Sequence, residues 1–236
     1  QFTLLGTRML FVATSNTTGK ELWISDGTAQ GTKLLKDIEP GPGSSEPLGL
    51  VRAGDLVFFH ASTTANGREL WVSDGTDVGT HLVADLYPGT GSAFRNDRQP
   101  RTMLKAQGRR VWFTATDNAA TPCALYVSDG SAAGTRCGLN AADNLIYTNE
   151  VLTLSNGAVA FDAWRATDGE EVRVVRNGRL LNLPGGDVHA GPGSSGPSEL
   201  AATPRGMVYF SADDGNTGRE LWKLDLSDFI FTDGLE

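Results

Sequence analysis

The chain has 236 residues, of which 39% are hydrophobic and 20% are charged, with a formal net charge of −8 and an isoelectric point near 4.9. This composition provides enough apolar material for a folded core and too few charges for a disordered chain. The acidic balance and the lack of a Lys/Arg cluster argue against nucleic acid as a partner, and no run of 18 apolar residues predicts a membrane span.

A tripeptide of the form Phe-x-Ala occurs five times and marks a repeat. Its phenylalanines are spaced by 48, 54, 48 and 49 residues, and a glycine precedes each copy at a nearly constant distance. Four copies are followed by an Asp-Gly or Asn-Gly turn signal, the fourth being Asn177-Gly178. Such a period indicates repeated supersecondary units. The five repeats are expected at approximately residues 1–39, 40–87, 88–142, 143–190 and 191–236.

Each repeat contains four short stretches that we predict to be strands. In the second repeat they cover residues 47–52, 56–62, 68–73 and 80–86. No window shows the apolar spacing of a substantial helix. The sequence therefore predicts an all-β, five-bladed β-propeller with four antiparallel strands per blade and a single domain over residues 1–236. A stacked solenoid is the alternative, but it would leave apolar end faces without a polar cap.

The two cysteines fall in the third repeat and are candidates for a disulfide. When this repeat is aligned with the second, Cys123 matches Arg68 at the start of the third strand, and Cys137 matches Leu82 near the start of the fourth. Facing residues of such a hairpin lie close enough for a disulfide after a small adjustment. Two separate buried thiols are the alternative, and a metal pair is the weaker one. A disulfide would indicate an oxidising compartment.

The third strands carry a specific motif. Residues 21–28 read ELWISDGT and residues 69–76 read ELWVSDGT, each followed by a Gly-Thr pair. Residues 124–131 read ALYVSDGS, residues 220–222 keep ELW without the turn, and the fourth repeat shows neither the tryptophan nor the glutamate in register. The motif resembles the bacterial ELWxxDGT repeat family over the whole chain. That resemblance implies a secreted or cell-surface bacterial propeller and no activity for any residue.

The Ser-Asp-Gly-Thr turns have a structural interpretation. Their Asp and Ser side chains can hydrogen-bond nearby backbone groups, and the glycine supplies a positive φ. The turns are similar to the Asp-box hairpins of sialidases, where they are structural. We therefore assign no function to them.

Blade geometry sorts the loops onto two ends. With strands A to D running outwards, the A–B and C–D turns lie at one end, and the B–C loops and the crossings to the next blade lie at the other. Loops on rigid scaffolds often carry function, so Tyr87 and Tyr147, both in crossings, are candidate sugar-stacking residues. The alternative is that the Gly and Pro residues of the crossings serve chain geometry alone.

Three glutamates, Glu46, Glu150 and Glu199, precede the predicted innermost strands of blades two, four and five. In a closed ring they would approach a common axis, where convergent carboxylates could contact a ligand, hold a cation or perform acid/base glycoside chemistry. Their neighbours are Ser, Pro, Thr and Asn, with no aromatic wall of the kind that raises a carboxyl pKa. We therefore expect no catalytic set and predict that the protein is not an enzyme. Ordinary exposed glutamates at loop ends are the alternative.

A loop in the last repeat offers oxygen ligands of the kind that calcium prefers, with Asp213, Asp214 and Asn216 as candidates. It lacks the length and the closing carboxylate of a dedicated site, so a polar turn is the alternative. The three histidines share no metal-ligand spacing. We expect no cofactor, with calcium as the one candidate ion.

These features predict a secreted, non-enzymatic binding module that recognises carbohydrate or a cell-surface ligand through its loop face or between its blades. Repeated weak sites would gain avidity together. Two alternatives stay open: a glycoside hydrolase with carboxylates at the channel mouth, and a structural or interaction propeller within a larger surface protein. Equivalent sites in several repeats would favour the binding module, whereas one asymmetric site would favour the enzyme.

Overall fold

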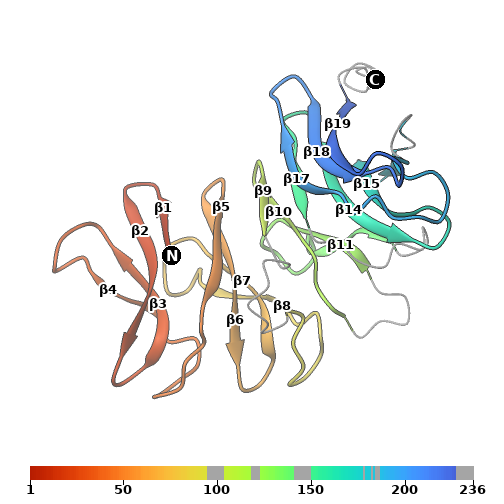
Figure 1. Ribbon diagram of the computed structural model, residues 1–236. Coiled ribbons are helices and arrows are strands. Elements are labelled where there is room, and N and C mark those ends of the chain that lie inside the picture. The colour runs from red at the N-terminus through yellow and green to blue at the C-terminus, as the bar shows by residue number, and fades with distance from the viewer. Residues whose placement is uncertain are drawn as a thin grey trace. The chain divides into compact units, whose positions relative to one another are not determined.

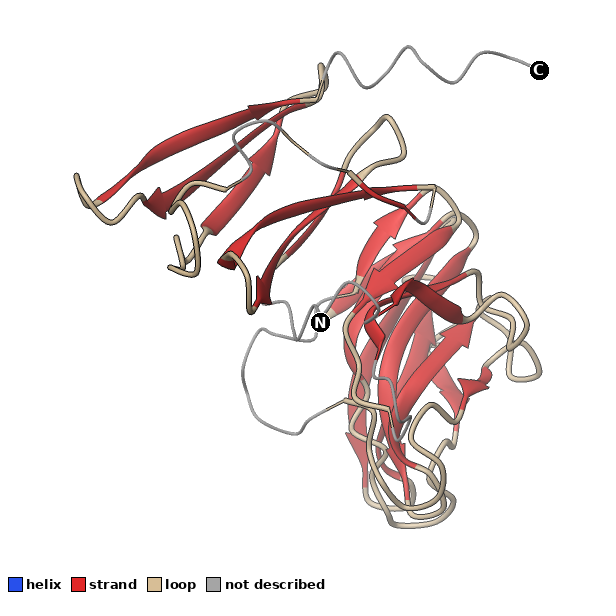
Figure 2. Ribbon diagram, turned by 90° about the vertical axis from the view of Figure 1, so that its right-hand side faces the viewer, coloured by secondary structure: helices blue, strands red, loops and turns tan. Residues whose placement is uncertain are grey.

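The computed structural model describes residues 1–94, 104–117, 123–140, 150–177, 179–181, 183 and 187–226. Over these residues the chain consists of strands and loops, and no helix occurs among them (Figure 2). Accordingly, the described part holds no helix with the length and apolar character that a membrane span needs. The prediction of an all-β chain is confirmed.

The strands form five separate sheets, one in each repeat, and we call each sheet a blade (Figure 1). Blade one contains β1 (Phe2–Leu5), β2 (Arg8–Ser15), β3 (Gly19–Ser25) and β4 (Lys33–Lys36). Blade two contains β5 (Leu48–Ala53), β6 (Leu56–Thr63), β7 (Gly67–Ser73) and β8 (His81–Ala84). Blade three contains β9 (Lys105–Gln107), β10 (Arg110–Phe113), β11 (Cys123–Ser128) and β12 (Arg136–Asn140). Blade four contains β13 (Val151–Thr153), β14 (Val159–Arg165), β15 (Gly169–Arg176) and β16 (Arg179–Leu180). Blade five contains β17 (Ser198–Ala202), β18 (Met207–Asp213) and β19 (Arg219–Asp225).

The strand order within each blade follows the chain. Four blades have the four predicted strands, and the fifth has three among the described residues. Because consecutive strands are antiparallel, the A–B and C–D turns lie at one end of a blade, which we call the turn end. The B–C loops and the crossings to the next blade lie at the other, which we call the crossing end. The first crossing covers residues 37–47, the second 85–94 and the fourth 187–197.

The chain comprises two compact units, residues 1–137 and 138–236, which we describe separately. In the N-terminal unit the first strands of successive blades contact each other, β1 with β5 and β5 with β9, and in the C-terminal unit β13 contacts β17. Within each unit, neighbouring blades therefore meet through their first strands, as in a propeller. The single domain over residues 1–236 remains a prediction.

The core lies between neighbouring blades within each unit. Phe59 and Ala61 of β6 are fully buried and pack in one cluster with Leu10, Leu22 and Ile24 of blade one. Blade two thus sets the bulky and the small side chain of its Phe-x-Ala tripeptide against the preceding sheet, which gives dense packing. The C-terminal unit repeats this arrangement, with Phe210, Ala212, Val172 and Val174 in one cluster.

Candidate functional site at the crossing end of the blades

Three buried glutamates hold the crossings in place. Glu21, Glu69 and Glu171 lie on the third strands β3, β7 and β15, and each is 0% exposed. A buried carboxylate needs hydrogen-bond donors, and the crossing that follows each blade supplies them from its backbone. We call each arrangement a glutamate lock.

Every lock uses the same chain spacing, with backbone N–H donors 17, 18 and 24 residues after the glutamate. In blade one the donors lie 3.1 Å (Ile38), 3.4 Å (Glu39) and 2.8 Å (Ser45) from the carboxylate oxygens of Glu21. One side chain therefore ties down both ends of a crossing. The corresponding donors are Leu86, Tyr87 and Ala93 for Glu69, and Val188, His189 and Ser195 for Glu171.

A serine hydroxyl adds a fourth donor to two of the three locks. Ser45 Oγ donates to Glu21, and Ser195 Oγ donates to Glu171 at 2.7 Å. Burial raises the pKa of both carboxyls, and these hydroxyl bonds lower it again in part.

The lock of blade two has Ala93 at the serine position and so lacks the hydroxyl. Burial raises the pKa of Glu69 to about 7, against the lowering effect of its three backbone bonds, and the charge of Asp85 adds to the rise. The three locks share one backbone geometry, but the carboxyl of blade two lacks the hydroxyl bond that lowers the pKa of the other two.

The lock in blade four corrects the expectation that the fourth repeat lacks the glutamate in register. That expectation aligned Asn177-Gly178 with the Asp-Gly turns, which is one residue out. Asn177 has a φ of 51°, the left-handed conformation that Gly75 adopts at 83° in blade two. Asparagine tolerates this region because its short polar side chain can bond locally. Asn177 therefore corresponds to the turn glycine, Glu171 to the motif glutamate, and Arg173 takes the tryptophan position.

The first, second and fourth crossings are also bound to the blades on both of their sides, near the B–C loops. In the first crossing, Lys20 N–H donates to Ser44 Oγ at 2.9 Å, and Ser62 N–H of the next blade donates to the Ser45 carbonyl at 2.7 Å. Equivalent pairs of bonds hold the second and fourth crossings. A Cβ at Gly19 would lie 1.9 Å from the carbonyl oxygen of Gly43, so only glycine allows this close approach. The crossing backbones are therefore rigidly supported.

One position in each crossing varies in chemistry on this constant backbone. Glu39, Tyr87 and His189 each donate their backbone N–H to a lock, and all three side chains are half-buried. Each side chain packs on the glycine four residues further on, since a Cβ there would come within 2.8, 2.0 and 2.4 Å of it, respectively. We call Glu39, Tyr87 and His189 the variable crossing positions.

Two of the variable crossing positions, Glu39 and His189, reach the B–C loop of the following blade. The Glu39 carboxylate accepts the Thr64 N–H at 2.9 Å and also the Thr64 hydroxyl. The His189 ring lies beside Gly215, where an added Cβ would be 2.5 Å from its Cε1. At these two junctions the site thus combines one crossing with the next B–C loop. Tyr87 was singled out from the sequence, whereas Tyr147 lies outside the described residues.

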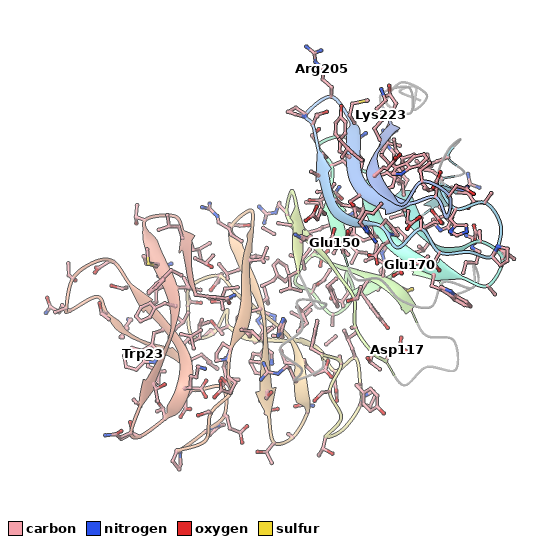
Figure 3. The ribbon with its side chains drawn as sticks, viewed as in Figure 1. Trp23, Asp117, Glu150, Glu170, Arg205 and Lys223 are labelled. Atoms are coloured by element: carbon pink, nitrogen blue, oxygen red, sulfur yellow. A yellow bond between two sulfur atoms is a disulfide. The ribbon has the colours of Figure 1, made fainter. Side chains whose placement is uncertain are left out.

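The three glutamates expected near the axis have different surroundings. Glu46 lies in the first crossing and forms an ion pair with Lys20 at 2.7 Å, with both side chains partly exposed. Glu150, just before β13, accepts the N–H groups of Glu199 at 3.2 Å and Leu200 at 2.8 Å (Figure 3). Glu150 and Glu199 therefore come together in the C-terminal unit, with the Glu150 carboxylate bound to the neighbouring backbone.

Gln1 shows that this contact is a repeated clamp between first strands. Its Oε1 accepts the N–H groups of Gly49 at 2.8 Å and Leu50 at 3.2 Å, at the start of β5. Glu199 has a φ of 60° where Gly49 has 70°, so the two occupy the same place in their blades. The Glu150 carboxylate thus accepts hydrogen bonds from the first strand of the next blade, as the Gln1 side chain does.

The loop proposed for calcium is closed by its own hydrogen bonds. Asp214 Oδ1 accepts the N–H groups of Asn216 at 2.8 Å and Thr217 at 2.7 Å, and Asp213 Oδ1 accepts that of Gly215 at 2.8 Å. These bonds, that of Thr217 first, lower the pKa of Asp214. Within the described ranges, no group of three or more His, Cys, Asp or Glu side chains is arranged to hold a metal ion.

Cys123 of β11 and Cys137 of β12 form a disulfide, with an S–S distance of 2.06 Å and a Cα–Cα distance of 5.7 Å. The predicted pairing is confirmed. It ties the C and D strands of blade three, the blade whose motif has Ala124 in place of the lock glutamate.

The Asp-Gly turns at the opposite end are self-contained. Asp26 Oδ1 accepts the N–H of Thr28 at 2.9 Å and its hydroxyl at 2.7 Å. The hydroxyl bond is the main cause that lowers the pKa of Asp26, and Asp74 and Asp129 are bonded in the same way. These contacts support the structural interpretation of the turns.

Charge divides between the two ends of the C-terminal unit. In Figure 3, Arg205 of the β17–β18 turn lies at the far end of this unit from Glu170. The turns there carry mostly basic side chains, and at the crossing end acidic side chains outnumber the arginines Arg165 and Arg219. The basic residues are Arg176, Arg179 and Arg205, and the acidic residues are Asp168, Glu170, Asp187, Asp213 and Asp214. The junction of blades four and five therefore has an excess of acidic side chains, which disfavours anionic ligands there.

The sequence comparisons name no relative: no family model matches the chain, and no curated protein matches it. Solved structures do resemble it. Prolyl oligopeptidase B from Galerina marginata has a TM-score of 0.53 at 12% identity, over 94% of this chain and 31% of that one. A prolyl endopeptidase scores 0.52 at 16% identity, over 95% and 32%. A puromycin-hydrolyzing peptidase of Mycobacterium tuberculosis scores 0.51 at 16% identity, over 95% and 37%.

The chain thus spans about a third of the length of these structures, 31–37%. The likeness, at such low identity, concerns the fold alone. Together with the five antiparallel sheets, it identifies the chain as a β-propeller, and the five sheets fit the predicted five blades.

Proposed function

We propose that the protein is a secreted, non-enzymatic binding module that recognises carbohydrate at the crossing end of its blades. The observation that carries this proposal is the set of variable crossing positions. Glu39, Tyr87 and His189 stand on one backbone frame, and each is partly open to solvent. A rigid scaffold that presents different side chains at equivalent places is the usual basis of recognition by loops. Several equivalent sites also favour a binding module over an enzyme.

The surrounding chemistry favours neutral sugars. Tyr87 supplies a half-exposed aromatic face, and Glu39 and His189 supply hydrogen-bonding groups, as small polar ligands require. The acidic character of the crossing end of the C-terminal unit opposes sulfated or uronic-acid ligands there. Secretion is supported by the disulfide between Cys123 and Cys137, because such bonds persist in oxidising compartments.

A glycoside hydrolase receives less support from the carboxylates. Glu150 is bound to two backbone N–H groups, and Glu46 is paired with Lys20. A structural role within a larger surface protein is the second candidate. It is favoured by Phe2 and Leu4 of β1, large apolar side chains that are 74% and 56% exposed.

A glycan array tests the proposal, with the purified chain applied in calcium and in chelator. We expect binding to neutral glycans, weakened about tenfold by Tyr87→Ala, because an aromatic contact contributes about 0.5–1.5 kcal/mol. Val78→Ala is the matched control. Val78 is 88% exposed, but it lies in the β7–β8 turn at the turn end.

Loss of binding in Tyr87→Ala with full binding in Val78→Ala would support the crossing end as the binding face. An array without signal in both conditions would refute carbohydrate recognition. Equal binding by the two variants would refute the assignment of the face.

A further inference from the structure

We propose that the second crossing, residues 85–94, is a pH-responsive segment that Glu69 holds closed when its carboxyl is protonated and releases when that carboxyl is ionised. This inference rests on the proposed function, since the segment carries Tyr87, and it concerns the regulation of that site. At the lock itself, the segment differs from its counterparts in the hydroxyl that Ala93 lacks.

The second lock has one hydrogen-bond donor fewer than the other two locks. Glu69 is fully buried and faces the N–H groups of Leu86 at 3.0 Å, Tyr87 at 3.2 Å and Ala93 at 3.0 Å. The other two locks have the same three backbone bonds and a serine hydroxyl as well. Their carboxylates have four donors for one charge, and Glu69 has three. The ionised form is therefore least well supported in the second lock.

The groups that face Glu69 do not replace the missing donor. Asp85, from the same crossing, brings a second negative charge and adds to the rise in the Glu69 pKa. Tyr126, from β11 of the next blade, interacts with Glu69, but its hydroxyl bonds to Asp117, and burial raises the pKa of this phenol. Both neighbours leave the ionised carboxylate of Glu69 unfavourable where it lies.

The direction of the pH effect follows from linkage. When the crossing opens, Glu69 meets water and recovers its ordinary pKa of 4.5, whereas in the closed crossing burial raises it to about 7. The closed form therefore binds the proton more tightly, and acid favours closure. Between pH 5 and pH 8 the equilibrium constant for opening of the crossing should rise roughly 70-fold. An open second crossing releases the backbone N–H of Tyr87 from its lock.

Amide hydrogen exchange of the ¹⁵N-labelled protein tests this without any ligand. The rates for Leu86, Tyr87 and Ala93 are measured from pH 5 to pH 8 and corrected for intrinsic exchange. We expect the opening equilibrium to rise by tens of fold for these amides. The equivalent amides of the first and fourth crossings serve as internal references and should change less. They are Ile38, Glu39 and Ser45, and Val188, His189 and Ser195.

Two substitutions make the test specific. Ala93→Ser supplies the hydroxyl found at Ser45 and Ser195, and it should reduce the response to that of the reference crossings. Glu69→Gln removes the titrating group and should abolish the response. Ala93→Ser keeps the test available if Glu69→Gln fails to fold, because the equivalent serine is already accommodated twice in this chain.

An equal response in all three crossings would overturn the inference, and so would a response that survives Ala93→Ser. A silent glycan array would not affect these readings, because they need no ligand. If the array identifies a glycan that depends on Tyr87, its affinity should fall between pH 5 and pH 8 in the parent and stay constant in Ala93→Ser.

Discussion

The glutamate lock can be tested with two substitutions in the same tripeptide. Glu21 and Glu220 both begin a Glu-Leu-Trp sequence on a third strand. Glu21 is 0% exposed and holds the first crossing, whereas Glu220 is exposed on β19. We predict that Glu21→Gln strongly destabilises the protein and that Glu220→Gln has almost no effect.

The magnitude follows from the bonds of Glu21. Its two oxygens receive N–H groups from Ile38, Glu39 and Ser45 and the Ser45 hydroxyl. Glutamine keeps one oxygen, so in either orientation of its amide at least one N–H group loses its acceptor, at a cost of about 1–3 kcal/mol. The remaining bonds lose their charge assistance, and the relief of carboxylate burial offsets part of this. The net loss should be about 2–3 kcal/mol, against about 0.5 kcal/mol or less for the exposed Glu220.

Guanidinium unfolding, followed by tryptophan fluorescence, measures both variants against the parent. A shift in the midpoint at constant slope reports the change in the free energy of unfolding. The reasoning would be refuted if Glu21→Gln unfolded within about 0.5 kcal/mol of the parent, or if Glu220→Gln were equally damaging.

Three further predictions concern other elements of the fold. Replacing Cys123 and Cys137 together by serine should lower the free energy of unfolding by at most about 3 kcal/mol, the entropic value for a loop of this size, and a folded variant with reduced thermal stability in calorimetry is expected. Because the pKa of Glu69 is raised from 4.5 to about 7 on folding, the folded state holds the extra proton between these values. The free energy of unfolding should therefore fall as pH rises from 4.5 to 7, by up to about 3 kcal/mol. Urea midpoints of the parent and of Glu69→Gln, measured at each pH, test this. The prediction would be contradicted if the midpoint of the parent rose with pH relative to that of Glu69→Gln. Asn177→Ala should cost about 1 kcal/mol because alanine tolerates the φ of 51° poorly, whereas Asn177→Gly should be neutral or stabilising in the same assay.

Local signals in the sequence were sufficient for the blades and the disulfide. The predicted strands of the second repeat differ from β5–β8 by no more than about two residues at their ends, a usual uncertainty of boundaries. Alternating apolar residues and turn glycines specify strands without reference to the rest of the chain. The offset between Cys123 and Cys137 likewise predicted a pair across one hairpin, because hairpin register depends on a single turn.

Tertiary structure decided which of these residues form the candidate site. Glu21 is buried, and its donors come from a crossing 17 to 24 residues further along the chain. The same interval of 23 residues separates each lock glutamate from a crossing serine in the sequence, and it would have indicated the locks; these serines are Ser44, Ser92 and Ser194. The fourth repeat hid this interval, since Asn177 takes the place of a turn glycine by adopting its conformation.

The sequence by itself determined the repeat, the strand content and the cysteine pair, all of which depend on residues within one hairpin or one period. The raised pKa of Glu69 depends on its burial, and the position of Tyr87 depends on the hydrogen bond from its backbone N–H to Glu69. Both require that a strand and a distant crossing come together. Desolvation and hydrogen-bond geometry are properties of groups brought together by the fold. For that reason Glu21 and Glu69 share one Glu-Leu-Trp motif and one lock geometry but differ in the donors that their carboxylates receive.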